Sequence, residues 1–317
     1  MALFDGEIAK VVVVTGAGRG IGACEAIELA RQGARVVVND VDPDAASEVV
    51  GAISTQVGPG VACTHIGDCS DVAVADSLVA LALSTFGRLD AVVNNAGIVR
   101  DRTVAKMTPD EWDAVIRVHL RGHYALTHAA CAYWKDSVTA AGASFGMTTG
   151  HIVCTASTSG LLGNFGQANY GAAKAGIAAF STIVAQEMAR YGVTCNAIAP
   201  AARTRMTEGA YGEVGGGVST SDDFDFWNPD NVAPMVAFLC SDASAHISGK
   251  VFGVQGDTVE LYRPFTSVAV VENGKSRWDA AQLASRVDEL FESSGIASGP
   301  ENMMARLRYS MTDRNRH

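Results

Sequence analysis

The chain has 317 residues, of which 48% are hydrophobic and 18% charged, and its 24 basic and 34 acidic side chains give a formal net charge of −10. This composition excludes a disordered chain, and the acidic balance argues against a nucleic-acid partner, because binding to a phosphate backbone needs clustered Lys and Arg. The apolar runs, such as residues 11–14, have the length of strands and fall short of the roughly 20 residues that a membrane span needs. We therefore expect a globular protein without a nucleic-acid or membrane partner.

Cysteine usage and the start of the chain favour a reducing compartment. The seven cysteines are scattered, odd in number and without a CxxC pair, which is typical of reduced core thiols. The first residues are acidic and do not show the basic and apolar pattern of a secretion signal. We therefore expect a cytoplasmic protein, and we predict no metal site.

Apolar, β-branched runs alternate with segments of helical length along most of the chain. Such runs suit strands that are buried on both faces, and the segments between them supply the crossovers of a parallel sheet. The predicted strands cover residues 10–15, 35–39, 61–65, 90–94, 150–155, 193–198 and 250–254. The predicted helices include residues 21–32, 72–86, 109–132 and 169–191. We therefore predict an α/β fold with a doubly wound parallel sheet of about seven strands, of the Rossmann type.

Three segments interrupt this alternation. Residues 137–150 are rich in small side chains and are predicted to form a surface loop. Residues 207–231 are rich in Gly and Asp and carry two adjacent aromatics, which fits a lid over a substrate site and fits a flexible surface excursion equally well. We assign residues 1–256 to one core domain that includes this loop, and residues 257–317 to a C-terminal extension. The extension has helical spacing over 278–293, and we expect it to pack on the core or to border the substrate pocket.

A glycine-rich segment with the sequence Thr-Gly-Ala-Gly-Arg-Gly-Ile-Gly follows the first predicted strand and opens the first predicted helix. Glycines let the backbone approach a pyrophosphate closely, and the free N–H groups and dipole of a helix start favour an anion there. The strand before it and the helix after it make this a dinucleotide-binding turn rather than an isolated glycine cluster. Its predicted contact residues are Gly16, Arg19, Gly20, Ile21 and Gly22.

Asp40 closes the second predicted strand, at the distance downstream that suits hydrogen bonds to an adenosine ribose diol. Its carboxylate would repel the additional phosphate of NADP, so we predict NAD as the cofactor. Arg19 argues in the opposite direction, because a cation beside the glycine turn could pair with that phosphate. A helix-capping or solvated turn role for Asp40 is the alternative.

Tyr170 and Lys174 stand four residues apart, which places them on one face of the helix predicted there. A free Tyr titrates near 10, but a fixed Lys charge and an oxidised nicotinamide ring both favour the phenolate, which makes Tyr170 a credible acid/base. Ser157 follows the fifth predicted strand, where its hydroxyl could hold the oxygen of a substrate carbinol or carbonyl group. A Tyr and Lys pair alone is common on ordinary helices, and it is the combination with the glycine turn that indicates catalysis.

These motifs, together with Asn94-Asn95-Ala96-Gly97 after the fourth predicted strand, occur in the order found in short-chain dehydrogenases/reductases, and the chain resembles that family. The resemblance implies a cofactor role for the Asn-Ala-Gly segment, an acidic residue near the adenine, a nicotinamide ribose contact from Lys174, and a Pro and a Thr near the nicotinamide. These roles fall on Asn95, Ala96, Gly97, Asp68 with its neighbour Cys69, Pro200 and Thr204. The family usually has Pro-Gly where this chain has Pro200-Ala201, and one residue fewer precedes Thr204.

A closer similarity narrows the substrate class. The segments 118–122 and 163–170, and the shorter 198–200 and 205–207, resemble the (3R)-hydroxyacyl-CoA dehydrogenase unit of peroxisomal multifunctional enzyme type 2 and bacterial relatives that act on fatty or steroid side-chain acyl-CoA. This resemblance implies an acyl-CoA substrate in lipid or steroid degradation. Basic residues that follow the strands could pair with CoA phosphates, although an ordinary solvated surface explains them equally well. They are Arg100, Arg102, Lys106, Arg203 and Arg205.

His119 stands where most of the superfamily has an Asn that holds a proton-relaying water. A ring nitrogen of His119 could hold such a water, or the ring could merely pack within its helix. His123 and His128 have no such support, and we interpret them as packing or surface residues.

The sequence thus predicts NAD-dependent oxidation of a secondary hydroxyl on an acyl-CoA, in β-oxidation, by a short-chain alcohol dehydrogenase. One alternative is an NAD(P)-dependent hydroxysteroid dehydrogenase or ketoacyl reductase. Another is a non-catalytic NAD-binding partner or sensor subunit, against which the intact Ser157, Tyr170 and Lys174 argue. The family resemblance also implies a homodimer or homotetramer that pairs through the helices at 109–132 and 169–191.

Overall fold

The computed structural model describes residues 2–4, 9–141, 149–204, 224–263, 265–301 and 303. The chain forms two units, Met1–Tyr262 and Arg263–His317. The first unit is built on one eight-stranded sheet with the order β3-β2-β1-β4-β5-β6-β7-β8. Its strands are β1 (Val11–Thr15), β2 (Arg35–Asp40), β3 (Ala62–Ile66), β4 (Ala91–Asn94), β5 (Gly150–Thr155), β6 (Val193–Ala201), β7 (Val251–Gln255) and β8 (Thr258–Tyr262). All neighbouring strands are parallel except β7 and β8, which are antiparallel.

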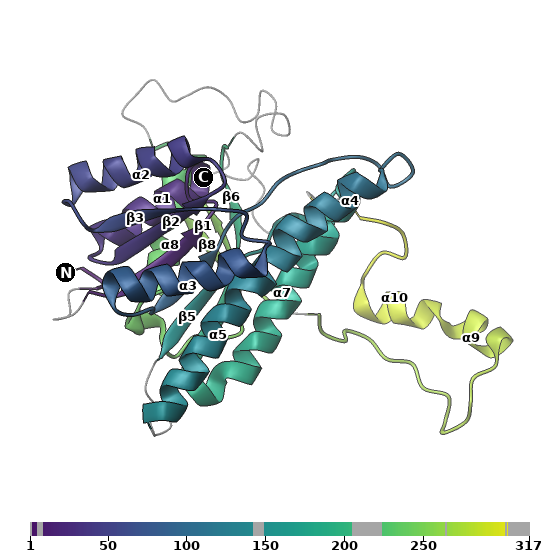
Figure 1. Cartoon of the computed structure of the whole chain (residues 1–317). Helices are drawn as coiled ribbons and strands as arrows, with labels where there is room; N and C mark the ends of the chain where they lie inside the picture. The colour runs from purple at the N-terminus through teal and green to yellow at the C-terminus, as the bar shows by residue number, and fades with distance from the viewer. Residues whose placement is uncertain are drawn as a thin grey trace. The chain divides into compact units, whose positions relative to one another are not determined.

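Helices cover both faces of this sheet (Figure 1). One face is covered by α1 (Gly20–Arg31), α2 (Pro43–Gln56) and α8 (Ala233–Leu239). The other is covered by α3 (Val72–Phe86), α5 (Gly122–Ala141) and α7 (Ala168–Met188). Two shorter helices, α4 (Pro109–Ile116) and α6 (Thr158–Leu162), contact α7.

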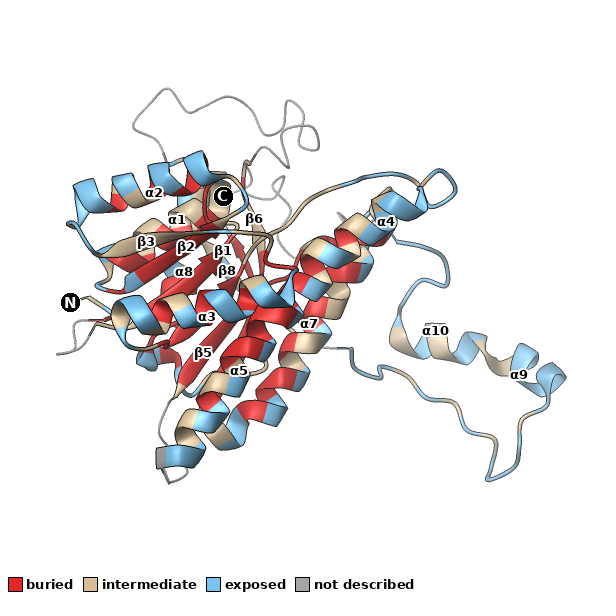
Figure 2. Ribbon diagram, in the orientation of Figure 1, coloured by how far each residue is buried: buried red, intermediate tan, exposed pale blue. Residues whose placement is uncertain are grey.

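The four valines of β1 explain why this layering is stable. Side chains alternate between the faces of a strand, so Val11 and Val13 enter the core with α3, α5 and α7 while Val12 and Val14 enter the core with α1, α2 and α8. All four are fully buried, as Figure 2 shows for the centre of the sheet. A continuous apolar run is therefore what a central parallel strand requires.

This architecture confirms the predicted doubly wound α/β fold, with two differences. Residues 258–262 form the additional strand β8, which the sequence interpretation had placed in the C-terminal extension. The helix predicted over 109–132 consists of α4, a π-helical segment η1 (Arg117–Arg121) and α5, and α5 continues to Ala141 into the region predicted as a loop. Residues 142–148 of that predicted loop lie outside the described residues.

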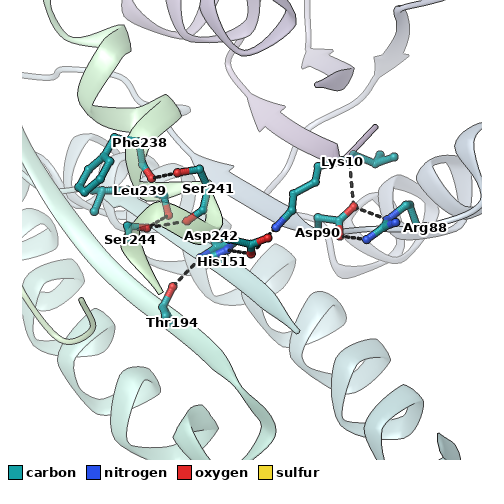
Figure 3. A network of polar contacts seen from close by, with 11 residues as sticks. Lys10, Arg88, Asp90, His151, Thr194, Phe238, Leu239, Ser241, Asp242 and Ser244 are labelled. Carbon is teal, nitrogen blue, oxygen red and sulfur yellow. Dashed lines mark hydrogen bonds and ion pairs between the residues drawn. The ribbon is translucent and has the colours of Figure 1, made fainter. Parts of the chain in front are cut away.

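Polar side chains join the strands at the amino-terminal edge of the sheet (Figure 3). Lys10, just before β1, pairs with Asp242, and the buried His151 of β5 lies 3.5 Å from the same carboxylate through Nε2. Nδ1 of His151 is 2.9 Å from Oγ1 of Thr194 on β6. Asp90, just before β4, accepts the N–H of Val11 and a bidentate pair of hydrogen bonds from Arg88. This edge is thus held by ion pairs and hydrogen bonds within the protein.

The segments that the sequence singled out as irregular are described only in part. Residues 205–223 of the predicted substrate loop lie outside the described residues, and its end forms a short 3-10 turn at Pro229–Asn231. The second unit contains α9 (Ala280–Arg286), which starts in a capping box, and α10 (Asp288–Ser294). Its packing on the core stays a prediction. No helix among the described residues is both long and apolar enough to span a membrane.

Candidate active site

The glycine turn lies at the carboxyl end of β1, beside β4, where the strand order reverses direction. Gly16 has a φ of +62°, which L side chains rarely adopt, and a Cβ there would lie 2.7 Å from Cα of Ala96. Helix α1 begins at Gly20, and no side chain caps its first turn. The free N–H groups of a helix start at this position can bind an anion.

Thr15 and Asn95 fix the glycine turn against the loop that follows β4. The Thr15 hydroxyl accepts the backbone N–H groups of Asn95 and Ala96, at 3.1 and 3.2 Å. The Asn95 amide donates to the carbonyl oxygens of Thr15 and Gly16, at 3.0 and 3.2 Å. The glycine turn and the loop after β4, which are far apart in the sequence, are therefore joined by these four hydrogen bonds.

Asp40, at the end of β2, faces the same turn. Its Oδ2 accepts the N–H of Gly18 at 2.9 Å, and its Oδ1 accepts the N–H of Asp42 at 3.0 Å. Arg19, the residue that favoured NADP, forms a 2.6 Å ion pair with Asp42. Asp42 also caps the start of α2 through its other oxygen. The Arg19 guanidinium thus already has a carboxylate partner beside the turn.

A cavity of about 970 Å³ extends from this turn to the ends of β4 and β5. All of the predicted cofactor residues line it, and so do His119, Tyr170 and Lys174. Arg100, one of the candidates for a CoA phosphate, lines it as well. The structure adds further lining residues that the sequence had not indicated as cofactor or substrate contacts: Asn39, Val41, Gly67, Ile98, Val99, Ala114, Arg117, Val118, Thr155 and Ala156. The predicted residues therefore share one cavity although they lie at the ends of five strands, β1, β2, β3, β4 and β6, and on α1, η1 and α7.

Tyr170 and Lys174 project from the first turns of α7. The Lys174 side chain is buried, its Nζ lies 5.5 Å from the centre of the Tyr170 ring, and it donates to the carbonyl oxygen of Thr155 at 2.5 Å. Burial lowers the pKa of Lys174 to about 7, while Cys154 and Glu25 act in the opposite direction. A buried lysine with a pKa near neutrality is typical of a site at which protons move.

Ser157 lies just beyond the end of β5, two residues after Thr155. It is buried, and its Oγ accepts the N–H of Ser159 at 3.2 Å, which caps the start of α6. Among the described residues that line the cavity, its neighbours Thr155 and Ala156 appear and Ser157 does not. Its hydroxyl hydrogen is still available for a ligand, because the capping bond uses an oxygen lone pair.

His119, in the π-helical segment, is buried beside Tyr170, with the two rings edge to face at 5.2 Å. Its Nε2 lies 2.7 Å from the carbonyl oxygen and 3.0 Å from the N–H nitrogen of Ile98. A Cβ on Gly97 would lie 2.3 Å from the His119 ring, so only glycine permits this approach. Burial and the charge of Lys174 lower the pKa of His119 to about 3, so the ring is neutral.

Several residues that shape the site escaped the sequence interpretation. Asn169, fully buried, donates to the carbonyl oxygens of Arg100 and Glu111 and so anchors the loop after β4 to the residue before Tyr170. Arg117 pairs with Asp68 and donates to Ser70 at 2.7 Å. These contacts join segments distant in sequence, and no local pattern indicates them. Asp42 is different, because its place two residues after Asp40 and before Pro43 is a recognisable capping signal.

The parallel α/β sheet and the cavity at its switch point define a nucleotide-binding enzyme fold, and comparison with known proteins gives the family. The model of the short chain dehydrogenase family matches residues 10–212. The chain therefore belongs to the short-chain dehydrogenase family, and the protein is an oxidoreductase.

Individual relatives agree with this assignment. The chain is 44% identical over 286 residues to the hydroxyacyl-CoA dehydrogenase ChsB1 of Mycobacterium tuberculosis, covering 89% of this chain and 88% of that protein. It is 37% identical over 315 residues to the mouse peroxisomal multifunctional enzyme type 2, covering 92% of this chain but only 39% of that longer protein. A crystal structure of a short chain dehydrogenase from Mycobacterium avium superposes with a TM-score of 0.82 at 40% identity, covering 95% of this chain and 99% of that one.

Proteins with this family's fold typically bind NAD or NADP, and the residues present fit such a cofactor. The backbone at Gly16 leaves no room for a side chain, α1 presents an uncapped first turn, and Asp40 lies beside the turn and lines the same cavity. The glycine turn and the start of α1 would hold the pyrophosphate, Asp40 the adenosine ribose, and Tyr170 with Lys174 the nicotinamide end.

Proposed function

We propose that this protein oxidises a secondary hydroxyl group on an acyl-CoA to a ketone, with NAD as the electron acceptor. The observation that carries the proposal is the shared cavity that Tyr170, Lys174, the glycine turn and Asp40 all line. The similarity to a hydroxyacyl-CoA dehydrogenase along nearly the whole of both chains supports the substrate class.

The catalytic roles are those that the family resemblance implies, and the position of Lys174 beside Tyr170 supports them. Tyr170 removes the hydroxyl proton, and the Lys174 ammonium, 5.5 Å from its ring, favours the phenolate that does so. Ser157 donates a hydrogen bond to the substrate oxygen. The bound cofactor supplies the chemistry of hydride acceptance. Lys174 also binds the nicotinamide ribose.

NAD is favoured over NADP by the charges beside the glycine turn. The Asp40 carboxylate is held in place by two backbone N–H groups, where it can accept the ribose hydroxyls and repel a phosphate. Arg19, the cation that could offset this repulsion, is paired with Asp42. Both arrangements disfavour an additional phosphate on the ribose.

Arg100 is the basic residue best placed for a CoA phosphate. It is exposed, lines the cavity, and makes its hydrogen bond to the carbonyl oxygen of its own neighbour, Val99. The other candidates differ, since Arg102 pairs with Glu111 and Arg203 pairs with Asp225. Arg205 lies outside the described residues.

His119 is proposed to relay the proton released through Tyr170 and Lys174. Its Nε2 is bound at Ile98, while its buried Nδ1 has no hydrogen-bond partner among the described residues. A buried polar atom without a protein partner is suited to hold a water molecule. The neutral ring can accept from that water or donate to it, depending on its tautomer.

The proposal is tested by steady-state formation of reduced cofactor with a panel of matched compounds. We expect turnover with NAD and a 3-hydroxyacyl-CoA or a steroid side-chain hydroxyacyl-CoA, and much weaker turnover with the free hydroxy acid, a free hydroxysteroid or NADP. A strong preference for NADP would contradict the role of Asp40. Equal activity on the free acid or the free hydroxysteroid would contradict the acyl-CoA assignment, and binding of NAD without turnover of any compound would favour a non-catalytic sensor.

We further propose a homo-oligomer in a reducing compartment such as the cytoplasm. All seven cysteines are free, which supports the compartment. Tyr124 on α5 and Ile183 on α7 are about half exposed, 48% and 52%, on the helices that the resemblance assigns to subunit pairing. Light scattering on the purified protein checks this, and a monomer at micromolar concentration would contradict it.

A further inference from the structure

Asn169 is not among the residues that line the cavity, but it connects two residues that are. Its side chain is fully buried at the start of α7, directly before Tyr170. Its Nδ2 donates to the carbonyl oxygens of Arg100 and Glu111, at 3.0 and 3.1 Å, and its Oδ1 accepts the N–H of Tyr170 at 2.7 Å. One amide group therefore contacts the loop after β4, the first turn of α4 and the first turn of α7.

These three hydrogen bonds fix the orientation of the Asn169 amide. The amide nitrogen has two hydrogens, which match the two carbonyl oxygens within hydrogen-bond distance. The reverse orientation would place the amide oxygen against those carbonyl oxygens and the amide nitrogen against the N–H of Tyr170. Neither Leu nor Asp, which have about the same size, offers two donors and an acceptor.

The Oδ1 contact satisfies a backbone group at the start of α7. The first N–H groups of a helix have no carbonyl partner within the helix. Gln167, the residue before α7, makes no side-chain capping bond, and the backbone bond of the first turn runs from the N–H of Gly171 to the carbonyl oxygen of Gln167. The N–H of Tyr170 comes before that bond and donates to Asn169 instead. Asn169 thus restrains the backbone of the proposed acid/base residue.

The loop after β4 runs beside the segment that leads into α7. The N–H of Arg102 donates to the carbonyl oxygen of Gly166 at 2.8 Å, and Nε2 of Gln167 donates to the Asp101 carboxylate, also at 2.8 Å. Asn169 adds a third contact, at the loop residue before Asp101. Asp101 and Arg102 are exposed, whereas Asn169 is fully buried. The contact made by Asn169 is therefore the one that solvent competes with least.

Two residues with separate tasks are thereby joined through one side chain. Arg100, the proposed partner of a CoA phosphate, and Tyr170, the proposed acid/base, both line the cavity. The phosphates and the reacting hydroxyl group belong to distant parts of one substrate molecule. A fixed separation between Arg100 and Tyr170 therefore allows binding of the phosphate to bring the hydroxyl group to the tyrosine in a reactive geometry.

We propose that Asn169 is a positioning residue that aligns the loop at Arg100 with Tyr170. It lets the phosphate contact contribute to turnover as well as to binding. A residue that served stability alone would not affect the preference between substrates with and without a phosphate. The inference rests on the proposed function, because Arg100 and Tyr170 have these tasks only within it.

The test compares a 3-hydroxyacyl-CoA with the corresponding 3-hydroxyacyl-pantetheine, which has the same reacting hydroxyl group but lacks the phosphates and the adenosine. The ratio of the two kcat/KM values does not depend on how much of the enzyme is folded. We expect a ratio of about tenfold or more in the wild type, in the range of one hydrogen bond to a charged group. Asn169→Leu should remove most of this ratio and lower kcat for the CoA substrate by about tenfold. Arg100→Gln is the reference and should lower the ratio to the same level.

Asn196→Leu is the matched control. Asn196 on β6 is also fully buried, it is not among the residues that line the cavity, and its amide also bonds to backbone groups. Its Nδ2 donates to the carbonyl oxygen of Ile247 at 2.9 Å, and its Oδ1 accepts the N–H of Lys250 at 3.1 Å. The same substitution there should lower stability and leave the ratio at its wild-type value.

Three results would overturn the proposal. They are an unchanged ratio in folded Asn169→Leu protein, a wild-type ratio near one, and a ratio that Arg100→Gln does not lower. If Asn169→Leu does not fold, Asn169→Ala gives the same test, because it loses the same donors and leaves space for water.

A second measurement does not depend on turnover. Hydrogen exchange at the N–H groups of Tyr170 and Arg102 should be about tenfold faster in Asn169→Leu than in the wild type. Exchange at Lys250 should change in Asn196→Leu instead. Unchanged exchange at Arg102 would show that Asn169 does not hold the loop, and would overturn the proposal. Wild-type protein inactive on both substrates would refute the proposed function, while the exchange rates would still decide whether Asn169 joins the two segments.

Discussion

At the amino-terminal edge of the sheet, Lys10, Asp242, Arg88 and Asp90 pair with one another or with backbone groups, and His151 lies between Thr194 and Asp242 (Figure 3). At the carboxyl edge the same kinds of side chain are left incomplete. Asn94 Oδ1, His119 Nδ1 and Thr155 Oγ1 are buried there without a hydrogen-bond partner among the described residues.

This difference between the two edges shows where the fold tolerates the loss of stability caused by buried polar atoms without hydrogen-bond partners. A buried polar atom without a partner costs about 1–3 kcal/mol, so a structure keeps such atoms where they serve a ligand, a water or a proton. Over the described residues, the amino-terminal edge has one such atom, Nε2 of His151, and it lies 3.5 Å from the Asp242 carboxylate. We therefore expect substitutions at the carboxyl edge to affect turnover and substitutions at the amino-terminal edge to affect stability.

The largest expected effect is on catalysis at the carboxyl edge. Tyr170→Phe removes the acid/base hydroxyl, and we expect kcat/KM for the hydroxyacyl-CoA to fall by about a thousandfold, in the range typical of general acid/base groups. The midpoint of thermal unfolding should barely change. Near wild-type turnover would remove Tyr170 from the mechanism, and a large loss of stability would break the contrast between the two edges.

The opposite result is expected for Asp90→Ala. Removing this carboxylate leaves the N–H of Val11 without its partner and the Arg88 guanidinium without its bidentate contact. We expect the free energy of unfolding, measured with urea, to fall by about 3 kcal/mol, while kcat stays within a factor of about two. A catalytic defect larger than the stability defect would show that the two edges are coupled.

Glu25 on α1 sharpens the comparison, because it is buried and belongs to neither edge of the sheet. Within the part of the chain that the structure describes, both of its carboxylate oxygens lack a hydrogen-bond partner. Burial raises its pKa from 4.5 to about 8, with Lys174 opposing the shift. Between these values the folded protein keeps a proton that the unfolded chain releases, so this group's contribution is full below pH 4.5 and is lost as the pH rises toward 8.

Glu25→Gln removes that dependence. We expect the variant to gain stability relative to the wild type as the pH rises, by about 3 kcal/mol near neutrality, since each pKa unit above 4.5 corresponds to about 1.4 kcal/mol. Urea unfolding of both proteins at several pH values measures the difference. A constant difference from acid to neutral pH would mean that Glu25 is ionised in the folded protein.

The smallest effect is expected at the rim of the cavity. Asp42→Asn keeps an oxygen to cap α2 but releases Arg19 from its ion pair. Because an exposed ion pair contributes up to about 1 kcal/mol, we expect NADPH to bind about fivefold more tightly and NADH to bind unchanged. Titration of the cofactor's fluorescence tests this, with Asp44→Asn as a matched exposed control on the same helix. Unchanged NADPH affinity would show that Arg19 does not face the ribose.

Most of the sheet could be predicted because its strands are buried on both faces. A run of four valines, as in β1, is typical of a central strand that is buried on both faces. The observed β5 has the bounds that the sequence predicted. Strand β8 was missed because it is an edge strand in which half-buried and exposed positions alternate. The two-residue turn Gly256-Asp257 between β7 and β8 was the available signal, since Gly followed by Asp is typical of a tight hairpin.

The residues of the site also fall into those that local sequence patterns predict and those that they do not. Gly16, Asp40, Tyr170 and Lys174 belong to local patterns whose chemistry can be interpreted from spacing alone, and the structure brings them to one cavity. Asn169 could not be predicted in this way, because its amide contacts backbone carbonyl oxygens of Arg100 and Glu111, which are distant in the sequence. Contacts between segments that are far apart in the chain leave no pattern within any one of them.

Helix α4, the π-helical segment η1 and helix α5 follow one another without a break. The number of residues in η1 therefore sets how α5 is rotated about its axis. Each residue of a helix adds about 100° of rotation, so deleting one residue from 117–121 would turn all of α5 about its axis. That rotation would carry Trp134 out of the core and the His123 ring away from β5. A deletion or insertion within residues 117–121 should therefore be far less acceptable than a substitution.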